Sequence, residues 1–264
     1  WTLVRMNQDG SYRATTRAHE LGHNMGLSHA GGNTLGYGDP TDVRGGQDRF
    51  VRELGVAAAA RATVGWIWKV PTAVQAAGDT YSYVTTLAPL RPATDGSVIS
   101  SLPAGQVAAI IIDCPTCLMP GTTGRDDDPM TSTSIVGGHL VISYRNRLVS
   151  SKSRVATTYR YVSVQVANDY ERAPNAKGNS GTDLYQLLAA GESYYVSYIG
   201  LMVLACNTAS TSAVVGTAYG TTQQDALTAA TAACSNALGS PPPTPPPPPP
   251  SACGCEVITF SGYD

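Results

Sequence analysis

Hydrophobic positions in the first 70 residues recur with the spacing of α-helices. A first helix is predicted from Ala14 to Gly26, and Gly26 ends it because glycine tolerates the left-handed conformation found at helix ends. A second helix is predicted from Asp48 to Val64, which includes four consecutive alanines. The glycine-rich stretch from Gly31 to Gly46 is predicted to be the loop between the two helices.

Between residues 76 and 205 the pattern changes from helical spacing to alternation. Val162, Val164 and Val166 alternate with polar residues, which is the period-two signature of a half-buried strand. The stretches His139 to Arg145 and Ser193 to Ala205 follow the same pattern. Repeated short strands separated by Gly, Pro and Asn indicate a β-sandwich.

A further helix is predicted from Thr222 to Leu238. Thr222 can cap its first turn, Asp225 lies at its positive end, and Gly239 can close it. The sequence therefore predicts where this helix begins and where it ends.

Beyond this helix the sequence becomes rich in proline. Ser240 to Pro250 is predicted to be an extended polyproline II rod, because proline has a fixed φ and no N–H. Such a rod is a semi-rigid spacer. Residues 251–264, with Cys253 and Cys255, are too short to fold alone, and we expect them to begin a further module.

Composition excludes two classes of partner. Hydrophobic residues make up 42% of the chain, charged residues 14%, and the net charge is -2. No basic stripe is present, so nucleic acid is not an expected partner. No apolar run approaches the roughly 18 residues of a membrane helix, so no membrane span is expected.

The six cysteines indicate disulfides rather than a metal knuckle. The pair Cys114-Pro-Thr-Cys117 has the spacing of a redox pair or of half a zinc knuckle, but no second C-x-x-C completes a knuckle. An even number of cysteines in a chain rich in Gly, Ser and Thr suits an oxidising compartment.

The residues that carry chemistry lie within eleven positions of one another. His19 and His23 are four residues apart, so on a helix they face the same side and can bind one zinc. Gly26 allows the chain to turn so that His29 supplies a third ligand. Three protein ligands leave a fourth position open for water, which is typical of a catalytic zinc.

Glu20 is the expected catalytic base, because it follows His19 at an angle that reaches a metal-bound water rather than the metal. The competing interpretation of a short H-E-x-x-H is an exposed helix with incidental histidines. The longer run uses three of the four histidines of the chain and favours the zinc site. The fourth, His139, is expected to be a half-exposed strand residue.

The run from His19 to His29 is the metzincin signature, and the wider sequence resembles the gametolysin (autolysin) family of green-algal peptidases. The resemblance rests on His19 to Ala30, then Gly36-Tyr-Gly-Asp39 and Gly65-Trp66, and further on His139 to Arg145 and Leu188 to Tyr194. It implies secreted zinc endopeptidases that cut proline- and hydroxyproline-rich glycoproteins of the cell wall or matrix. Carried over by position, His19, His23 and His29 are the zinc ligands and Glu20 is the base.

Two positions depart from the metzincin pattern. Arg44 stands where the family has a methionine in a turn beneath the zinc, and a cation there has to reach solvent or pair, for example with Asp39 or Asp42. Only about 18 residues precede His19, fewer than the upstream sheet of a metzincin needs. The peptidase region is therefore expected to be incomplete at its N-terminal side.

The expected fold class is α+β, with a partial metzincin-like zinc peptidase domain followed by a β-sandwich-like domain. The expected segments are the catalytic zinc region at 1–75, the β-rich domain with its C-terminal helix at 76–238, the spacer at 239–250 and a further module from 251.

The expected function is a secreted zinc metalloendopeptidase with Zn²⁺ as cofactor and a wall or matrix glycoprotein as substrate. The alternative is a catalytically impaired, peptidase-like structural or binding protein of the extracellular matrix. The intact Glu20 favours the enzyme, whereas Arg44 and the missing upstream sheet favour the alternative. A zinc-stabilised binding module fits less well, because structural zinc sites usually have four protein ligands.

Overall fold

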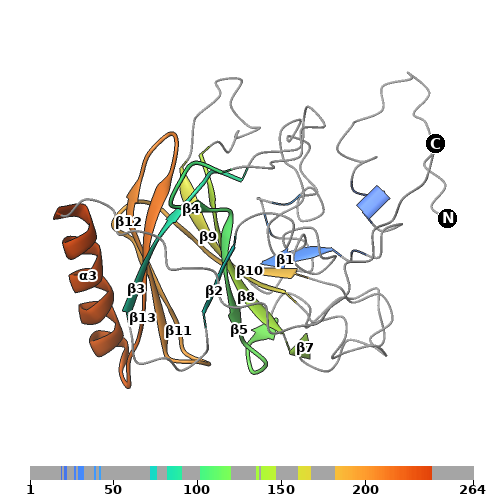
Figure 1. Ribbon diagram of the computed structural model, residues 1–264. Helices are drawn as coiled ribbons and strands as arrows, with labels where there is room; N and C mark the ends of the chain where they lie inside the picture. Colours follow the sequence, from blue (N-terminus) through green and yellow to red (C-terminus); the bar gives the residue numbers. More distant parts are fainter. Residues whose placement is uncertain are drawn as a thin grey trace, which may run out of the picture.

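The computed structural model describes the sheets and the last helix of the chain, together with isolated parts of the first 42 residues. The described residues are 19, 21–22, 27, 29–32, 39, 42, 72–75, 82–90, 102–119, 135–136, 138–146, 160–167 and 182–239. They form mostly β-sheet with one long helix, so the expected α+β class is confirmed (Figure 1). The finer assignments, a metzincin-like domain and a separate β-sandwich domain, stay predictions.

The largest sheet has six strands in the order β1-β10-β9-β8-β5-β2. Its strands are β1 (Ala30–Gly32), β2 (Thr72–Gln75), β5 (Ala109–Asp113), β8 (His139–Arg145), β9 (Tyr161–Ala167) and β10 (Thr182–Leu188). The four inner strands pair antiparallel, whereas β1 and β2 are added parallel at the two edges. Both edge strands therefore come from the first 75 residues of the chain.

A five-stranded sheet has the order β11-β12-β13-β3-β4. Its strands are β3 (Ser82–Leu87), β4 (Gln106–Val107), β11 (Ser193–Val196), β12 (Leu201–Thr208) and β13 (Ala213–Tyr219). A small separate sheet pairs β6 (Leu118–Met119) with β7 (Ile135–Val136). The described fold therefore has two large sheets.

The two large sheets bury one apolar core between them. On the six-stranded sheet the core side chains are alternate residues, such as Ile142 of β8 and Val164 of β9, both fully buried. Val203 of β12 and Val215 of β13 meet them from the other sheet. The predicted alternation at Val162, Val164 and Val166 therefore places all three valines in this core.

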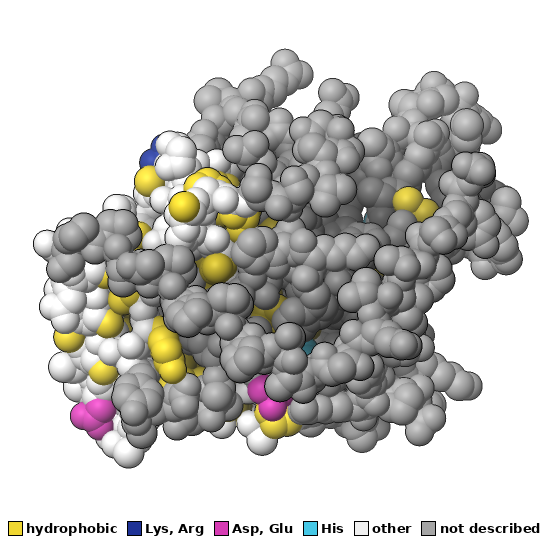
Figure 2. Space-filling view, in the orientation of Figure 1, with side chains coloured by type: hydrophobic (Ala, Val, Ile, Leu, Met, Phe, Trp, Pro, Cys, Tyr) yellow, Lys and Arg dark blue, Asp and Glu magenta, His cyan; other side chains and the backbone are white. Residues whose placement is uncertain are grey.

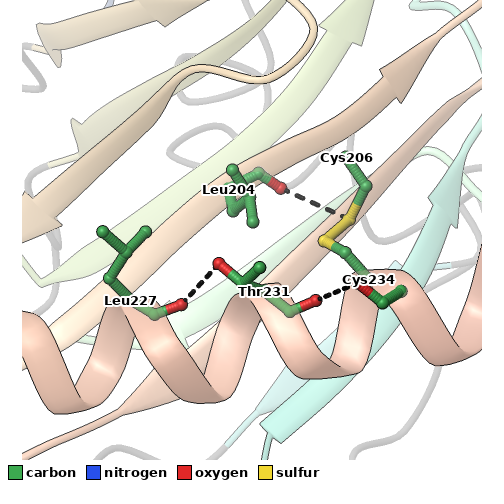
Figure 3. The surroundings of a disulfide bond; sticks show 6 residues. Leu204, Cys206, Leu227, Thr231 and Cys234 are labelled. Carbon is green, nitrogen blue, oxygen red and sulfur yellow. Dashed lines mark hydrogen bonds between the residues drawn. A yellow bond between two sulfur atoms is a disulfide. The ribbon is translucent and has the colours of Figure 1, made fainter.

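Helix α3 (Gln223–Gly239) covers the other face of the five-stranded sheet (Figure 1). Ala226, Ala230 and Cys234 are four residues apart and form one buried side of the helix. They pack on Met202 and Leu204 of β12. Small residues let the helix lie close to the sheet, and the disulfide Cys206–Cys234 joins the two elements (Figure 3).

The predicted N-cap of α3 is confirmed, whereas the helix ends at Gly239, one residue beyond the predicted Leu238. The backbone N–H of Asp225 donates to Oγ1 of Thr222 at 3.1 Å, so Thr222 is the N-cap. The hydroxyls of Thr222 and Thr221 donate to Oδ2 of Asp225 at 2.7 and 3.0 Å. These hydrogen bonds hold the pKa of Asp225 below its ordinary value, with the bond from Thr222 as the main cause.

Two sequence predictions for the strands were wrong in detail. Ser193 to Ala205 is a hairpin of β11 and β12 rather than one strand, and Gly200 has a φ of 67° in the turn that joins them. The polar positions of β8 and β9 are buried rather than exposed, since Ser143 is 1% and Ser163 is 2% exposed. The sheet is therefore covered on both faces at these strands.

Several predictions lie outside the described residues. They are the helix at 48–64, the proline rod at 240–250, and the module that contains Cys253 and Cys255. Within the described part of the chain, no helix is both long and apolar enough to cross a membrane. On the face shown in Figure 2, charged side chains of described residues are few and lie apart from one another.

Candidate metal centre

The candidate site begins on a helical turn near the start of the chain. His19, Leu21 and Gly22 are helical, as predicted for the segment from Ala14 to Gly26. The N–H of Leu27 donates to the carbonyl of Gly22 at 3.0 Å, a bond that spans six residues and is typical of helix ends that close with a Schellman motif. The side chain of Leu27 is buried and fixes the chain just after this turn.

This turn brings two of the three predicted zinc ligands together. The ring centroids of His19 and His29 are 5.1 Å apart, with 39° between the ring planes. Two imidazoles on one tetrahedral zinc, each bound at about 2.0–2.1 Å, have ring centroids roughly 5 Å apart. Both histidines are partly exposed, so solvent and ligands can reach them. The spacing of the two rings therefore fits a shared zinc ion.

The strand that follows His29 ties this segment to the six-stranded sheet. Strand β1 starts at Ala30, and its three residues pair in parallel with Thr182, Asp183 and Leu184 of β10. Gly31 and Gly32 thus belong to a strand, although the sequence predicted a loop from Gly31. His29 is consequently positioned directly beside the edge of a sheet.

A second segment, at Asp39 and Asp42, folds back on β1. The N–H of Asp39 donates to the carbonyl of Ala30, and the N–H of Asp42 donates to the carbonyl of Asp39, both at 3.4 Å. Both aspartates are fully buried. Burial lowers the pKa of the Arg145 guanidinium, and the nearby carboxylates of Asp42 and Asp39 raise it.

Oδ2 of Asp39 accepts a hydrogen bond from Nε2 of Gln165. Gln165 and Arg145 were not among the sequence-predicted site residues. Their only signal in the sequence is the alternation of polar and apolar residues on β8 and β9, a pattern that predicts a half-exposed polar face. Asp39 and Asp42 were considered as partners of Arg44, which is itself outside the described residues. Asp39 instead accepts a hydrogen bond from Gln165, and the carboxylates of both aspartates are near enough to Arg145 to raise its pKa.

The structure describes His139 but not the other two residues considered for the site, His23 and Glu20. Because these two lie outside the described residues, their roles stay predictions. His139 starts β8 opposite Asp113 and is partly buried, as expected for a strand residue outside the site. In the parts of the chain that the structure describes, no three His, Cys, Asp or Glu side chains gather as a metal-binding group.

Two disulfides are present among the described cysteines. Cys114 pairs with Cys117 and Cys206 pairs with Cys234. The expectation that the C-x-x-C pair forms a disulfide, rather than half a zinc knuckle, is confirmed. The candidate zinc site therefore depends on histidines and not on these thiols.

The candidate site lies within a range that matches a known protein family. The family model described as Gametolysin peptidase M11 matches residues 1–121. No curated protein and no solved structure matches the chain. The matched range contains the histidine run, Asp39 and Asp42, and extends to the Cys114–Cys117 disulfide. Over residues 1–121 the chain is therefore similar to the gametolysin M11 peptidases.

Proposed function

We propose that this chain is a zinc-dependent metalloendopeptidase in which His19, His23 and His29 hold the metal. The observation that carries the proposal is the 5.1 Å separation of the His19 and His29 rings inside the range matched by a peptidase family. A helix places His23 one turn from His19 and on the same side. Three imidazoles and one open position are the donor set of a catalytic zinc.

The chemistry divides between the metal and Glu20. A zinc held by these histidines would supply Lewis-acid chemistry, which would make a bound water more acidic and polarise the carbonyl of a peptide bond. Glu20 is proposed to accept a proton from the attacking water and to return it to the leaving amine. Because Glu20 follows His19 directly in the sequence, the same helical turn would position a ligand and the base.

The proposed substrates are proline- and hydroxyproline-rich glycoproteins of a cell wall or extracellular matrix, with the enzyme itself secreted. Three features support this. The two disulfides suit an oxidising compartment, the chain carries a proline-rich stretch at 240–250, and the family match agrees with the resemblance to gametolysin.

The experiment that tests the metal site is zinc analysis of purified variants. We expect about one zinc per chain in the wild type and loss of most of it in His19→Ala and His29→Ala, because each substitution removes a coordination bond. His139→Ala is the matched control, since it changes the histidine at the start of β8. Equal zinc content in all four proteins would reject the site.

A second candidate function rests on Arg44. If its charge disturbs the site, the chain would be a matrix protein that keeps the peptidase fold but cleaves nothing. A wild-type chain that binds zinc through His19 and His29, yet cleaves no proline-rich peptide, would favour this function. Recovery of cleavage in Arg44→Met would then assign the defect to this residue.

A further inference from the structure

The outer face of the six-stranded sheet carries a buried polar row. On β8 and β9, Leu140, Ile142 and Val164 point into the core between the sheets. The residues between them point to the opposite face, where Ser143 of β8 is paired with Ser163 of β9. Their hydroxyl oxygens are 2.8 Å apart and buried. Arg145 and Gln165 belong to the same row and are 4% and 0% exposed.

The segment at Asp39 and Asp42 supplies charged and hydrogen-bonding partners for this row. Gln165 donates from Nε2 to Oδ2 of Asp39. The carboxylates of Asp39 and Asp42 act on the buried guanidinium of Arg145. A buried charge requires such partners, because removal from water is costly unless opposite charges and hydrogen bonds compensate. Asp39 is thus hydrogen-bonded to a sheet residue 126 positions away, and Asp42 and Asp39 both interact electrostatically with Arg145 of the neighbouring strand.

The same segment contacts the backbone next to a proposed zinc ligand. Asp39 donates its N–H to the carbonyl of Ala30, the residue that follows His29. A displacement of Asp39 would therefore move the start of β1, and with it the backbone of His29. Residues that orient metal ligands in this way commonly change metal affinity by about 10- to 100-fold when they are mutated.

We propose that Arg145 and Gln165 are positioning residues of the zinc site, which hold Asp39 and Asp42 so that β1 presents His29 toward His19. This inference rests on the proposed zinc function. Arg145 supplies charge and a planar fork of donors, which a lysine cannot reproduce. Gln165 supplies one directed hydrogen bond to Asp39.

The test measures zinc affinity by competition with a chromophoric chelator, and the absorption spectrum of the cobalt-substituted protein. Arg145→Lys keeps the charge and is expected to weaken zinc binding about 10-fold or more and to shift the cobalt spectrum. Gln165→Met removes the bond to Asp39 without removing a charge, and zinc affinity is expected to fall about 10-fold.

Tyr144→Phe is the matched control on the opposite face of β8. Tyr144 is fully buried beside Arg145 in sequence, and its hydroxyl donates to the carbonyl of Ala209, away from the polar row. This variant is expected to lose stability but to keep the zinc affinity and cobalt spectrum of the wild type. A purely structural role of Arg145 and Gln165 would make all three variants alike.

The outcomes separate this inference from the proposed function. Absence of zinc from the wild type, or its retention in His29→Ala, would reject the zinc site itself. If the wild type binds zinc through its histidines while Arg145→Lys and Gln165→Met keep its affinity and spectrum, the positioning role is rejected. If neither variant folds, the polar row is required for the stability of the whole fold, and the positioning role is rejected as well.

Discussion

The sulfur of Cys234 lies against Gly216 of β13, so close that a Cβ built on this glycine would be 2.8 Å from it. The carbonyl of Ala230 would be 3.1 Å from the same Cβ. Only a residue without a side chain fits beneath the disulfide that joins α3 to the five-stranded sheet (Figure 3). Gly216 thus sets how closely the helix can approach.

Gly216→Ala should therefore destabilise the fold by about 1–3 kcal/mol, the usual cost of overpacking a well-filled site. Denaturant unfolding measures this free energy. Gly239→Ala is the control, because nothing lies within 4 Å of the Cβ at that position. The cost at Gly216 should also fall when both Cys206 and Cys234 are alanine, since the sulfur contact is then absent. Equal stability of Gly216→Ala and the wild type would contradict the close contact.

Removal of the Cys206–Cys234 disulfide should lower the stability considerably. This bond closes a loop with a sequence separation of 28, for which the chain-entropy model gives about 3–4 kcal/mol. The double variant Cys206→Ala/Cys234→Ala should show this loss in thermal or denaturant unfolding. Cys114–Cys117 has a separation of only 3, so added reductant should change the double variant less than it changes the wild type.

Thr222→Ala should remove the N-cap of α3 and cost about 0.5–2 kcal/mol of stability. The reason is that the N–H of Asp225 loses the hydroxyl that accepts its hydrogen bond. Thr231→Ala is the matched control, because Thr231 lies within the helix and its hydroxyl donates to the carbonyl of Leu227. Alanine is the better helix former there, so this variant should be at least as stable as the wild type.

Because of Asp225, the free energy of unfolding should decrease as the pH is lowered into the acid range. Its pKa in the folded chain lies below the ordinary value of 3.8, mainly because Thr222 and Thr221 donate hydrogen bonds to the carboxylate. The stabilisation is therefore complete above the unfolded pKa and is lost as the pH falls through the folded pKa. The stability difference between wild type and Asp225→Asn should be constant near neutral pH and shrink below about pH 3.8. A difference that grows toward acid pH would have the wrong sign.

Glu20→Gln should keep the zinc and lose turnover. The amide is nearly isosteric with the carboxylate but cannot accept a proton, so kcat should fall by about 10² or more. Zinc content and cleavage of a proline-rich peptide are measured on the same preparations. Chelation of the metal should abolish the wild-type activity and added zinc should restore it. Full activity of Glu20→Gln at equal zinc content would exclude Glu20 as the base.

Much of the local structure could be predicted from the sequence. The cap residue of α3, the strand from His139 to Arg145, and the core valines of β9 all lie where the patterns predicted them. The helical turn at His19 agrees with the motif, and His29 lies near His19 as a shared metal requires. Each of these features depends on residues a few positions apart, or on one turn of the chain.

The partners of buried groups could not be predicted in this way. Alternation on β8 and β9 identified one apolar face, but it did not reveal that the polar face is covered as well. It also did not reveal that β1 and β2 complete the same sheet as β8 and β9. An alternating pattern predicts which residues of a strand share a face. It does not predict which element packs on that face, because that element comes from a distant part of the chain.

The sequence by itself determined which residues could form a zinc site, because His19, His23 and His29 lie within eleven residues of one another. Only the tertiary structure decided that Cys206 pairs with Cys234, and that Asp39 meets Gln165 across 126 positions. The physical reason is that local conformation follows from the preferences of neighbouring residues. The partners of a disulfide or of a buried charge, by contrast, are distant in the sequence and become neighbours only when the sheets assemble.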